Sequence, residues 1–286
     1  MTPSEGQTAG YRIAWRTSGI RAGAHKGRMA GSGGLLRANV PLVQQPDPRR
    51  IAIRESLRDP AEQVLVRQTQ QLSAVPVYVL IDVSASMGFA GRCRKVSIAC
   101  DLAEALSVAA HRAGDAFGLV AFDNQVREQF IVRRTRSRPL VSAMLQDLRN
   151  FTPERPGIAG LAEAAGLLSG EKKLVILISD FLWDVNEAEA ALLALSRHDI
   201  VPIEIEDSSQ LDDLPDWGLF SLVDLETRKR RLVAMRPALK KRWIGQRSKR
   251  RDGMRELFGR LGRDMFSIKD RIAWDRFETY LMYEGG

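Results

Sequence analysis

The sequence predicts an α/β fold, a doubly wound and mostly parallel sheet of the Rossmann-like kind with N- and C-terminal extensions. Strongly apolar runs of strand length support this prediction, and they occur at 77–82, 117–122, 173–179 and 200–205. Segments with helical periodicity separate these runs. Strands that alternate with helices pair in parallel and are covered by helices on both faces of the sheet.

The first 75 residues are expected to form an N-terminal extension. Residues 1–40 are rich in Gly, Arg and Ala without sustained periodicity, which favours loops with short strands. The run Gly-Ser-Gly-Gly at 31–34 follows no apolar strand and lacks the Lys-Ser/Thr of a phosphate-binding loop, so we expect a flexible turn there. Alternation at 49–54 and 64–66 predicts two short strands joined by a turn at Asp59-Pro60.

The central domain is expected to span residues 76–210. Its first strand leads to a helix over 95–112, in which Ile98, Leu102 and Leu106 recur at helical spacing. The remaining elements of the alternating pattern are an edge strand over 126–132 and helices over 139–148, 161–168 and 187–197.

Residues 211–286 are expected to form a C-terminal extension. Apolar runs at 218–225 and 231–235 predict a hairpin with its turn at 226–229. The elements expected after the hairpin are a basic helix over 237–262, a short strand at 266–268 and an aromatic helix over 274–283.

Charge is distributed unevenly along the chain, although the total is only +8. Residues 76–227 contain 14 Lys and Arg against 23 Asp and Glu, whereas residues 228–269 contain 16 against 3. An acidic central domain is therefore followed by a basic segment, which suits attraction to that domain, to an acidic partner or to nucleic-acid phosphates. The basic helix also carries apolar residues, so we favour packing of one face against the domain.

Composition indicates a globular protein, and we expect it in the cytoplasm. Hydrophobic residues make up 44% and charged residues 27% of the chain, which are ordinary values for a folded domain. No apolar run approaches the roughly 20 residues that a membrane span requires, and the N-terminus lacks a signal-peptide pattern. Cys93 and Cys100 lie two helical turns apart, too far for a disulfide, and no Cys/His spacing indicates a zinc site.

Oxygen-bearing side chains follow two of the predicted core strands where each strand ends. Asp82, Ser84 and Ser86 follow the first strand, and Asp180 follows the third. In an open α/β sheet the carboxyl ends of the strands form the ligand-binding edge, so these side chains are expected to meet there. Carboxylates and hydroxyls suit a hard cation, and we predict a site for Mg²⁺, with Ca²⁺ or Mn²⁺ as alternatives. A structural alternative stays open, because Asp and Ser also cap helices and form tight turns.

Three motifs together resemble a von Willebrand factor A domain. They are Val-Leu-Ile-Asp-Val-Ser-Ala-Ser-Met at 79–87, Gly-Asp-Ala-Phe-Gly-Leu-Val-Ala-Phe at 114–122 and Leu-Ile-Ser-Asp-Phe at 177–181. With Asp-Pro-Arg-Arg-Ile-Ala-Ile-Arg-Glu-Ser-Leu-Arg-Asp at 47–59, the chain resembles bacterial proteins of unknown function encoded beside MoxR-type AAA+ ATPases. Some of those proteins are accessory factors for the maturation of methanol dehydrogenase.

The resemblance implies a metal-ion-dependent adhesion site at the end of the first strand. By position, Ser84 and Ser86 would contact the metal directly. Asp82 and Asp180 would bind it either directly or through water.

One departure from the family pattern weakens the metal prediction. The family has a threonine ligand in a second loop, where this chain has Ala159 within Gly-Ile-Ala-Gly-Leu at 157–161. Alanine offers no oxygen ligand. Thr152, earlier in the same loop, is a candidate substitute if that loop folds inward.

The resemblance also implies a function, that of a non-enzymatic adaptor. In such domains the metal is recognitional, and here it would join the chain to a protein client or to a MoxR-type AAA+ ATPase. One alternative is nucleic-acid binding through the basic segment, for example the cluster at 247–251. Another is a Mg²⁺-dependent phosphoryl hydrolase with Asp82 as nucleophile, although that chemistry would want a second acid where Ser84 stands.

Overall fold

A computed structural model describes residues 11–13, 22–30, 34–213, 215–223 and 230–284. The described residues divide into two compact units: a larger one within 76–112 and 116–286, together with residues 11 and 12, and a smaller one within 13–75 and 113–115. The predicted hairpin turn at 226–229 and residues 31–33 of the predicted glycine turn lie outside the described residues.

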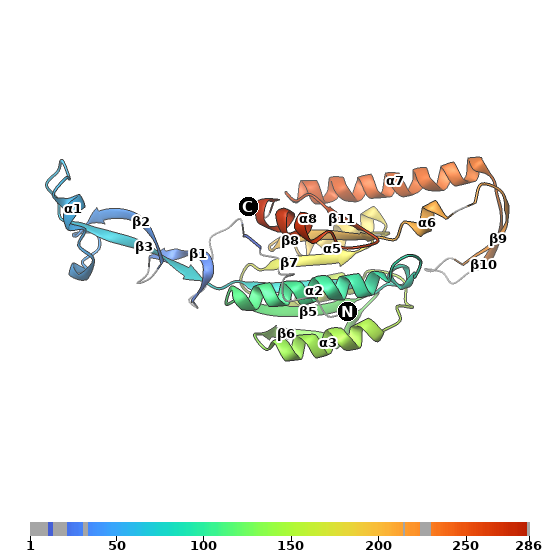
Figure 1. The fold of residues 1–286 in the computed structure, drawn as a ribbon, viewed down its shortest axis with the longest axis horizontal. Coiled ribbons are helices and arrows are strands. Elements are labelled where there is room, and N and C mark those ends of the chain that lie inside the picture. The colour runs from blue at the N-terminus through green and yellow to red at the C-terminus, as the bar shows by residue number, and fades with distance from the viewer. Residues whose placement is uncertain (1–10, 14–21, 31–33, 214, 224–229, 285–286) are drawn as a thin grey trace. The chain divides into compact units, whose positions relative to one another are not determined.

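The larger unit is built on a six-stranded sheet with the strand order β11-β8-β7-β4-β5-β6 (Figure 1). Neighbouring strands are parallel throughout, except that β6 pairs antiparallel with β5. This confirms the predicted α/β fold with a mostly parallel sheet. The strands are β4 (Pro76–Asp82), β5 (Ala116–Phe122), β6 (Val126–Thr135), β7 (Leu174–Ser179), β8 (Asp199–Glu206) and β11 (Phe266–Lys269).

Helices occupy the segments between these strands, as their apolar periodicity predicts. The long ones are α2 (Lys95–Arg112), α3 (Arg138–Asn150) and α7 (Pro237–Arg260). The shorter elements are η2 (Ala85–Gly88), α4 (Gly160–Leu167), α5 (Val185–Leu193), α6 (Ser209–Asp212), α8 (Trp274–Thr279) and the π-helical turn η3 (Tyr280–Glu284). Among the described residues no helix combines the length and the apolarity that crossing a bilayer requires.

The core lies on both faces of the sheet because all residues of β4, β5 and β7 are buried. Alternate strand residues point to opposite faces. On one face, Leu80, Val120 and Leu177 share a buried cluster with residues of α4, α5 and α7. On the other face α2 packs against β4, β5 and β8.

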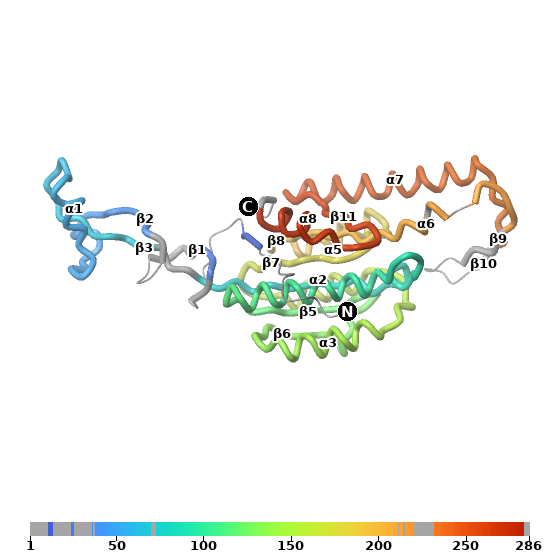
Figure 2. The backbone as a smooth tube through the Cα atoms, viewed as in Figure 1, coloured from blue at the N-terminus to red at the C-terminus, as the bar shows by residue number. Residues whose placement is uncertain are grey.

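Strand order reverses beside β4. The chain passes from β4 through α2 into β5 on one side, and it later enters β7 on the other side (Figure 2). The carboxyl ends of β4 and β7 are therefore adjacent at a topological switch point, the usual ligand-binding position in open α/β sheets.

The C-terminal part of the larger unit contains the predicted hairpin and basic helix. Strands β9 (Gly218–Val223) and β10 (Arg230–Met235) pair antiparallel as a separate two-stranded sheet. Helix α7 buries Met254, Leu257 and Phe258, so one face of the basic helix does pack on the domain.

The smaller unit holds an antiparallel sheet with the order β1-β3-β2, formed by β1 (Ala22–Ala30), β2 (Gly34–Pro41) and β3 (Leu65–Ser73). Of the strand predicted at 64–66, Leu65 and Val66 belong to β3, which extends to Ser73. The strand predicted at 49–54 is wrong, because η1 (Pro48–Arg50) and α1 (Ile53–Ser56) occupy most of that segment. Asp47 accepts a hydrogen bond from the Arg49 backbone, and Pro48 at the first helical position fixes φ, so local capping outweighs the alternating pattern.

Candidate functional site

An aspartate stands at the carboxyl end of every parallel strand of the main sheet. The residue is either the last of the strand or the first after it, and the five are Asp82, Asp123, Asp180, Asp207 and Asp270. All of them except Asp270 are buried. The carboxyl edge of the sheet is therefore lined with carboxylates, and two of these lie on the adjacent strands of the switch point.

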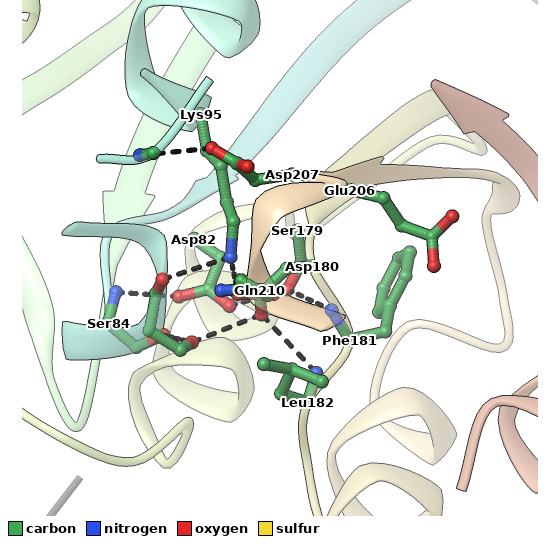
Figure 3. Close-up of polar contacts among 12 residues, drawn as sticks. Asp82, Ser84, Lys95, Ser179, Asp180, Phe181, Leu182, Glu206, Asp207 and Gln210 are labelled. Atoms are coloured by element: carbon green, nitrogen blue, oxygen red, sulfur yellow. Dashed lines mark hydrogen bonds and ion pairs between the residues drawn. The ribbon is translucent and has the colours of Figure 1, made fainter. Parts of the chain in front are cut away.

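The structure brings the four predicted site residues together at this point, and Figure 3 labels Asp82, Ser84 and Asp180 among them. The hydroxyl of Ser86 donates to Asp180 Oδ1 at 3.1 Å, and the Ser84 and Ser86 hydroxyls lie 3.2 Å apart. Asp82 Oδ1 accepts from the backbone N–H of Ser84 at 2.7 Å. Two segments that are almost 100 residues apart in the sequence thus form one buried cluster of oxygen atoms, as the sequence argument expects.

The capping alternative explains only part of this geometry. Asp82 does form a tight turn of the Asx type through the Ser84 backbone. Ser84 stands at the N-cap position of η2, but its side chain makes no capping hydrogen bond there. The two hydroxyls instead face each other, and the Ser86 hydroxyl also faces Asp180, so they are arranged around the cluster rather than around the helix end.

Lys95 is the most important member of the cluster that the sequence argument missed. Its ammonium group donates to Asp180 Oδ2 at 2.6 Å and to the carbonyl oxygen of Ser86 at 3.1 Å. The side chain is completely buried. A signal was present, because Lys95 precedes Ile98 and Leu102 by three and seven residues and so shares the buried face of α2.

Ser179 and Trp183 complete the surroundings of Asp82. The hydroxyl of Ser179 donates to Asp82 Oδ2 at 2.5 Å, and the indole N–H of Trp183 donates to the same oxygen at 2.9 Å. Burial, followed by repulsion from Asp180, raises the pKa of Asp82 to about 7, although the hydrogen bonds from Ser179 and Ser84 oppose this shift. Asp82 is thus a carboxyl group whose neutral form is favoured by its position.

The loop before α4 approaches the site without adding an oxygen ligand to it. The N–H of Ala85 donates to the carbonyl oxygen of Arg155 at 2.9 Å, which places this loop beside η2. Ala159 and Thr152 are both exposed. Within the described part of the chain no hydrogen bond joins the Thr152 hydroxyl to the cluster, so the structure does not bring this candidate ligand to the site.

Asp207 holds the segment that carries Lys95. Its carboxylate accepts from the backbone N–H groups of Gly91, Arg92 and Cys93 at 3.0–3.2 Å. Burial raises the pKa of Asp207, but hydrogen bonds from Ser209 and from the backbone amides of Cys93 and Arg92 outweigh it and hold the pKa well below its usual range. A Cβ at Gly91 would lie within 3 Å of Asp207 Oδ1, so the close approach requires glycine. The entry into α2 is consequently fixed in place.

The side chains of the cluster carry the kinds of oxygen atom that a hard cation binds, but they are not arranged to hold one. Two carboxylates and two hydroxyls are ligands that Mg²⁺ accepts. However, Asp180 is already paired with the Lys95 ammonium group, and Ala159 supplies no oxygen. A divalent ion would stand next to a buried positive charge, so the residues as placed do not fit Mg²⁺. Nor do the described residues contain a group of three or more His, Cys, Asp or Glu side chains able to hold a metal.

The basic segment makes ion pairs with the acidic part of the domain. Arg251 of α7 contacts Glu204 and Glu206 of β8 at 2.9 Å each, and Arg263 contacts Asp199 at 2.6 Å. These ion pairs neutralise part of the positive charge of the basic segment, and that part therefore needs no nucleic-acid phosphates to balance it. Attraction between the basic segment and the acidic part of the same domain, one of the interpretations of the charge pattern, is therefore present in the structure.

Comparison with known proteins shows similarity to several bacterial proteins that are described as uncharacterized. The sequence pattern of the family described as "Protein of unknown function DUF58" matches residues 49–253. An uncharacterized protein of Mycobacterium tuberculosis is 23% identical over 273 residues, which are 94% of this chain and 84% of the relative. A protein of Paracoccus denitrificans described as "in moxR 3′ region" is 36% identical over 81 residues, 28% of this chain and 73% of that protein.

Solved structures also show similarity to the chain. BatB from Bacteroides thetaiotaomicron matches 72% of this chain and 96% of its own, with 15% identity and a TM-score of 0.45. Proximal thread matrix protein 1 from the mussel byssus, in a structure with a zinc-occupied MIDAS motif, matches 46% of this chain and 38% of its own. Its identity is 21% and its TM-score 0.35.

Proposed function

The chain belongs to the family of proteins of unknown function DUF58, and from this premise we propose that it is a non-enzymatic protein-interaction adaptor. The observation that carries the proposal is the buried polar cluster at the switch point of the sheet, where Ser86 of one segment bonds Asp180 of another. That position is where open α/β sheets bind their ligands. The partner would dock on the loops around this cluster.

The proposed partner is a MoxR-type AAA+ ATPase, with a protein client presented to it. Support comes from the Paracoccus denitrificans relative, which is described by its place in the moxR 3′ region. The motifs at 47–59 and 79–87 support the same association through their resemblance to proteins encoded beside such ATPases.

The arrangement of the cluster favours binding over hydrolysis. Asp82, the candidate nucleophile of a phosphoryl hydrolase, has both carboxyl oxygens occupied by donors from Ser84, Ser179 and Trp183. Ser86 donates to Oδ1 of Asp180, and the other carboxyl oxygen of Asp180 is already paired with the Lys95 ammonium group. Neither side chain is poised as a nucleophile with an activating base beside it.

The predicted Mg²⁺ is not part of this mechanism. If an ion were bound, Ser84, Ser86 and Asp180 would hold it, and it would supply a positive charge for a partner carboxylate. The pairing of Lys95 with Asp180 opposes that arrangement. We therefore propose that the partner binds directly to protein groups at the carboxyl edge of the sheet, without a bridging ion.

A pair of leucine substitutions tests the docking edge. Leu182 is half-buried and stands two residues after Asp180; its backbone N–H donates to Asp180, and its carbonyl oxygen accepts from Arg250. We expect Leu182→Arg to abolish co-purification with the MoxR-type ATPase of the same genome and to leave the melting temperature nearly unchanged. The control is Leu193→Arg, an exposed position at the other end of α5 and thus at the opposite edge of the sheet. Equal binding by both variants and the unmodified protein, or no ATPase binding by any of them, would refute the proposal.

A further inference from the structure

We propose that Lys95 is the resident cation of the switch-point cluster, so that the chain itself supplies the positive charge that a divalent ion would otherwise bring. This inference concerns the site alone and does not depend on the proposed partner. It implies that the cluster is assembled permanently and that it responds to neither Mg²⁺ nor chelators.

The burial of Lys95 is the first support. A lysine is almost never fully buried unless it is paired, because removal of an ammonium group from water is costly. Lys95 is one of the largest fully buried side chains among the described residues, and its partner Asp180 is buried as well. The sequence thus places a charged residue on a mostly apolar buried helix face, where the ion pair with Asp180 offsets the cost of its burial.

The contacts of the ammonium group are the second support. They reach Asp180 Oδ2 at 2.6 Å and the Ser86 carbonyl oxygen at 3.1 Å, and these residues belong to the two segments that form the cluster. The same Asp180 accepts from the Ser86 hydroxyl through its other oxygen. Lys95 therefore joins the two segments from within, which is the structural task of a bridging metal ion.

The anchoring of Lys95 is the third support. The preceding amides of Gly91, Arg92 and Cys93 are bound by Asp207, and α2 begins at Lys95 itself. The ring of Phe89 lies 5.9 Å from the ammonium nitrogen, within reach of a cation–π contact. Because its backbone is fixed on one side by a carboxylate and on the other by the helix, the side chain is held in the cluster.

The test measures the response of the purified full chain to MgCl2, MnCl2 and EDTA by thermal unfolding and titration calorimetry. For the unmodified protein we expect the same melting temperature in EDTA and in millimolar Mg²⁺, and no stoichiometric binding of either ion. Lys95→Met should lower the melting temperature in EDTA. Millimolar Mg²⁺ should then raise it by about 3 °C or more, because the ion fills the vacated position.

Lys173→Met is the matched control. Lys173 is also buried, but its ammonium group donates to the backbone carbonyls of Ser169 and Glu171 rather than to a carboxylate. This variant should lose stability without gaining a response to Mg²⁺. A folded Lys95→Met protein that ignores Mg²⁺ would overturn the proposal. So would stoichiometric Mg²⁺ or Mn²⁺ binding by the unmodified protein that Ser86→Ala removes, a measurement that stands even if Lys95→Met fails to fold.

Discussion

The Lys95 ammonium group lies 2.6 Å from Asp180 Oδ2, and both side chains are completely excluded from solvent. The pair connects the first residue of α2 with the residue after β7, 85 positions further along the chain. In such surroundings a charge interacts strongly with its partner, and removal of that partner leaves an unpaired buried charge that strongly destabilises the fold. The pair is therefore a sensitive reporter of how the candidate site is held together.

We predict strong coupling between these two residues. Lys95→Met or Asp180→Leu alone should each lower the free energy of unfolding by about 3–5 kcal/mol, because each leaves an uncompensated buried charge. The double variant should lose clearly less than the two single variants added together. Urea unfolding at neutral pH, applied to all four proteins of the cycle, gives the coupling energy. Additive single effects would show that the two groups do not stabilise each other.

Helix α4 gives a second prediction, which compares two of its glycines. A Cβ at Gly160 would lie 2.4–2.8 Å from backbone atoms of Gln125 and Asp123, so Gly160→Ala should destabilise the fold by about 1–3 kcal/mol. Gly166 is exposed with open space around its Cα, and Gly166→Ala should stabilise by about 0.5–1 kcal/mol. Chemical denaturation measures both changes. Effects of the same sign would contradict the close packing of the start of α4 against the turn between β5 and β6.

Helix α7 gives a third prediction, based on two of its arginines. Arg251 pairs with Glu204, a carboxylate that is nearly inaccessible and whose pKa is raised by burial. Arg251→Met should therefore cost at least about 2 kcal/mol, because it strands Glu204. Arg260 pairs with Glu189 at an exposed position, and Arg260→Met should cost no more than about 1 kcal/mol. Similar losses for both variants in urea unfolding would argue against the packing of α7 on β8.

Periodicity in the sequence explains why the elements of the main sheet could be predicted, and long-range pairing explains what could not. The burial of β4 and the helical spacing in α2 are local patterns. The pairing of β11 with β8 joins residues more than 60 positions apart, which no local pattern reveals. In the candidate site, the meeting of Asp82 and Asp180 could be predicted because each of them stands at the carboxyl end of a core strand. The spacing in α2 places Lys95 on the buried face, but only the fold shows that it faces Asp180.

His198 gives the last prediction, which concerns pH. Burial, together with the nearby charges of Lys173 and Arg197, lowers the pKa of His198 from 6.5 to about 4. Below pH 6.5 the unfolded chain binds a proton at this residue and the folded chain does not, so the free energy of unfolding falls as pH falls towards 4. The slope from this residue is at most about 1.4 kcal/mol per pH unit.

The raised pKa of Asp82 acts in the opposite direction, since its contribution to stability falls as pH rises from 3.8 towards 7. The difference between variants is therefore the quantity to measure. In urea unfolding from pH 4 to 7, His198→Phe should lose the His198 contribution, so that its stability relative to the unmodified protein rises as the solution becomes more acidic. His111→Phe, at an exposed position on α2, serves as the control and should keep the original pH dependence. A constant difference between His198→Phe and the unmodified protein would show that His198 titrates alike in both states.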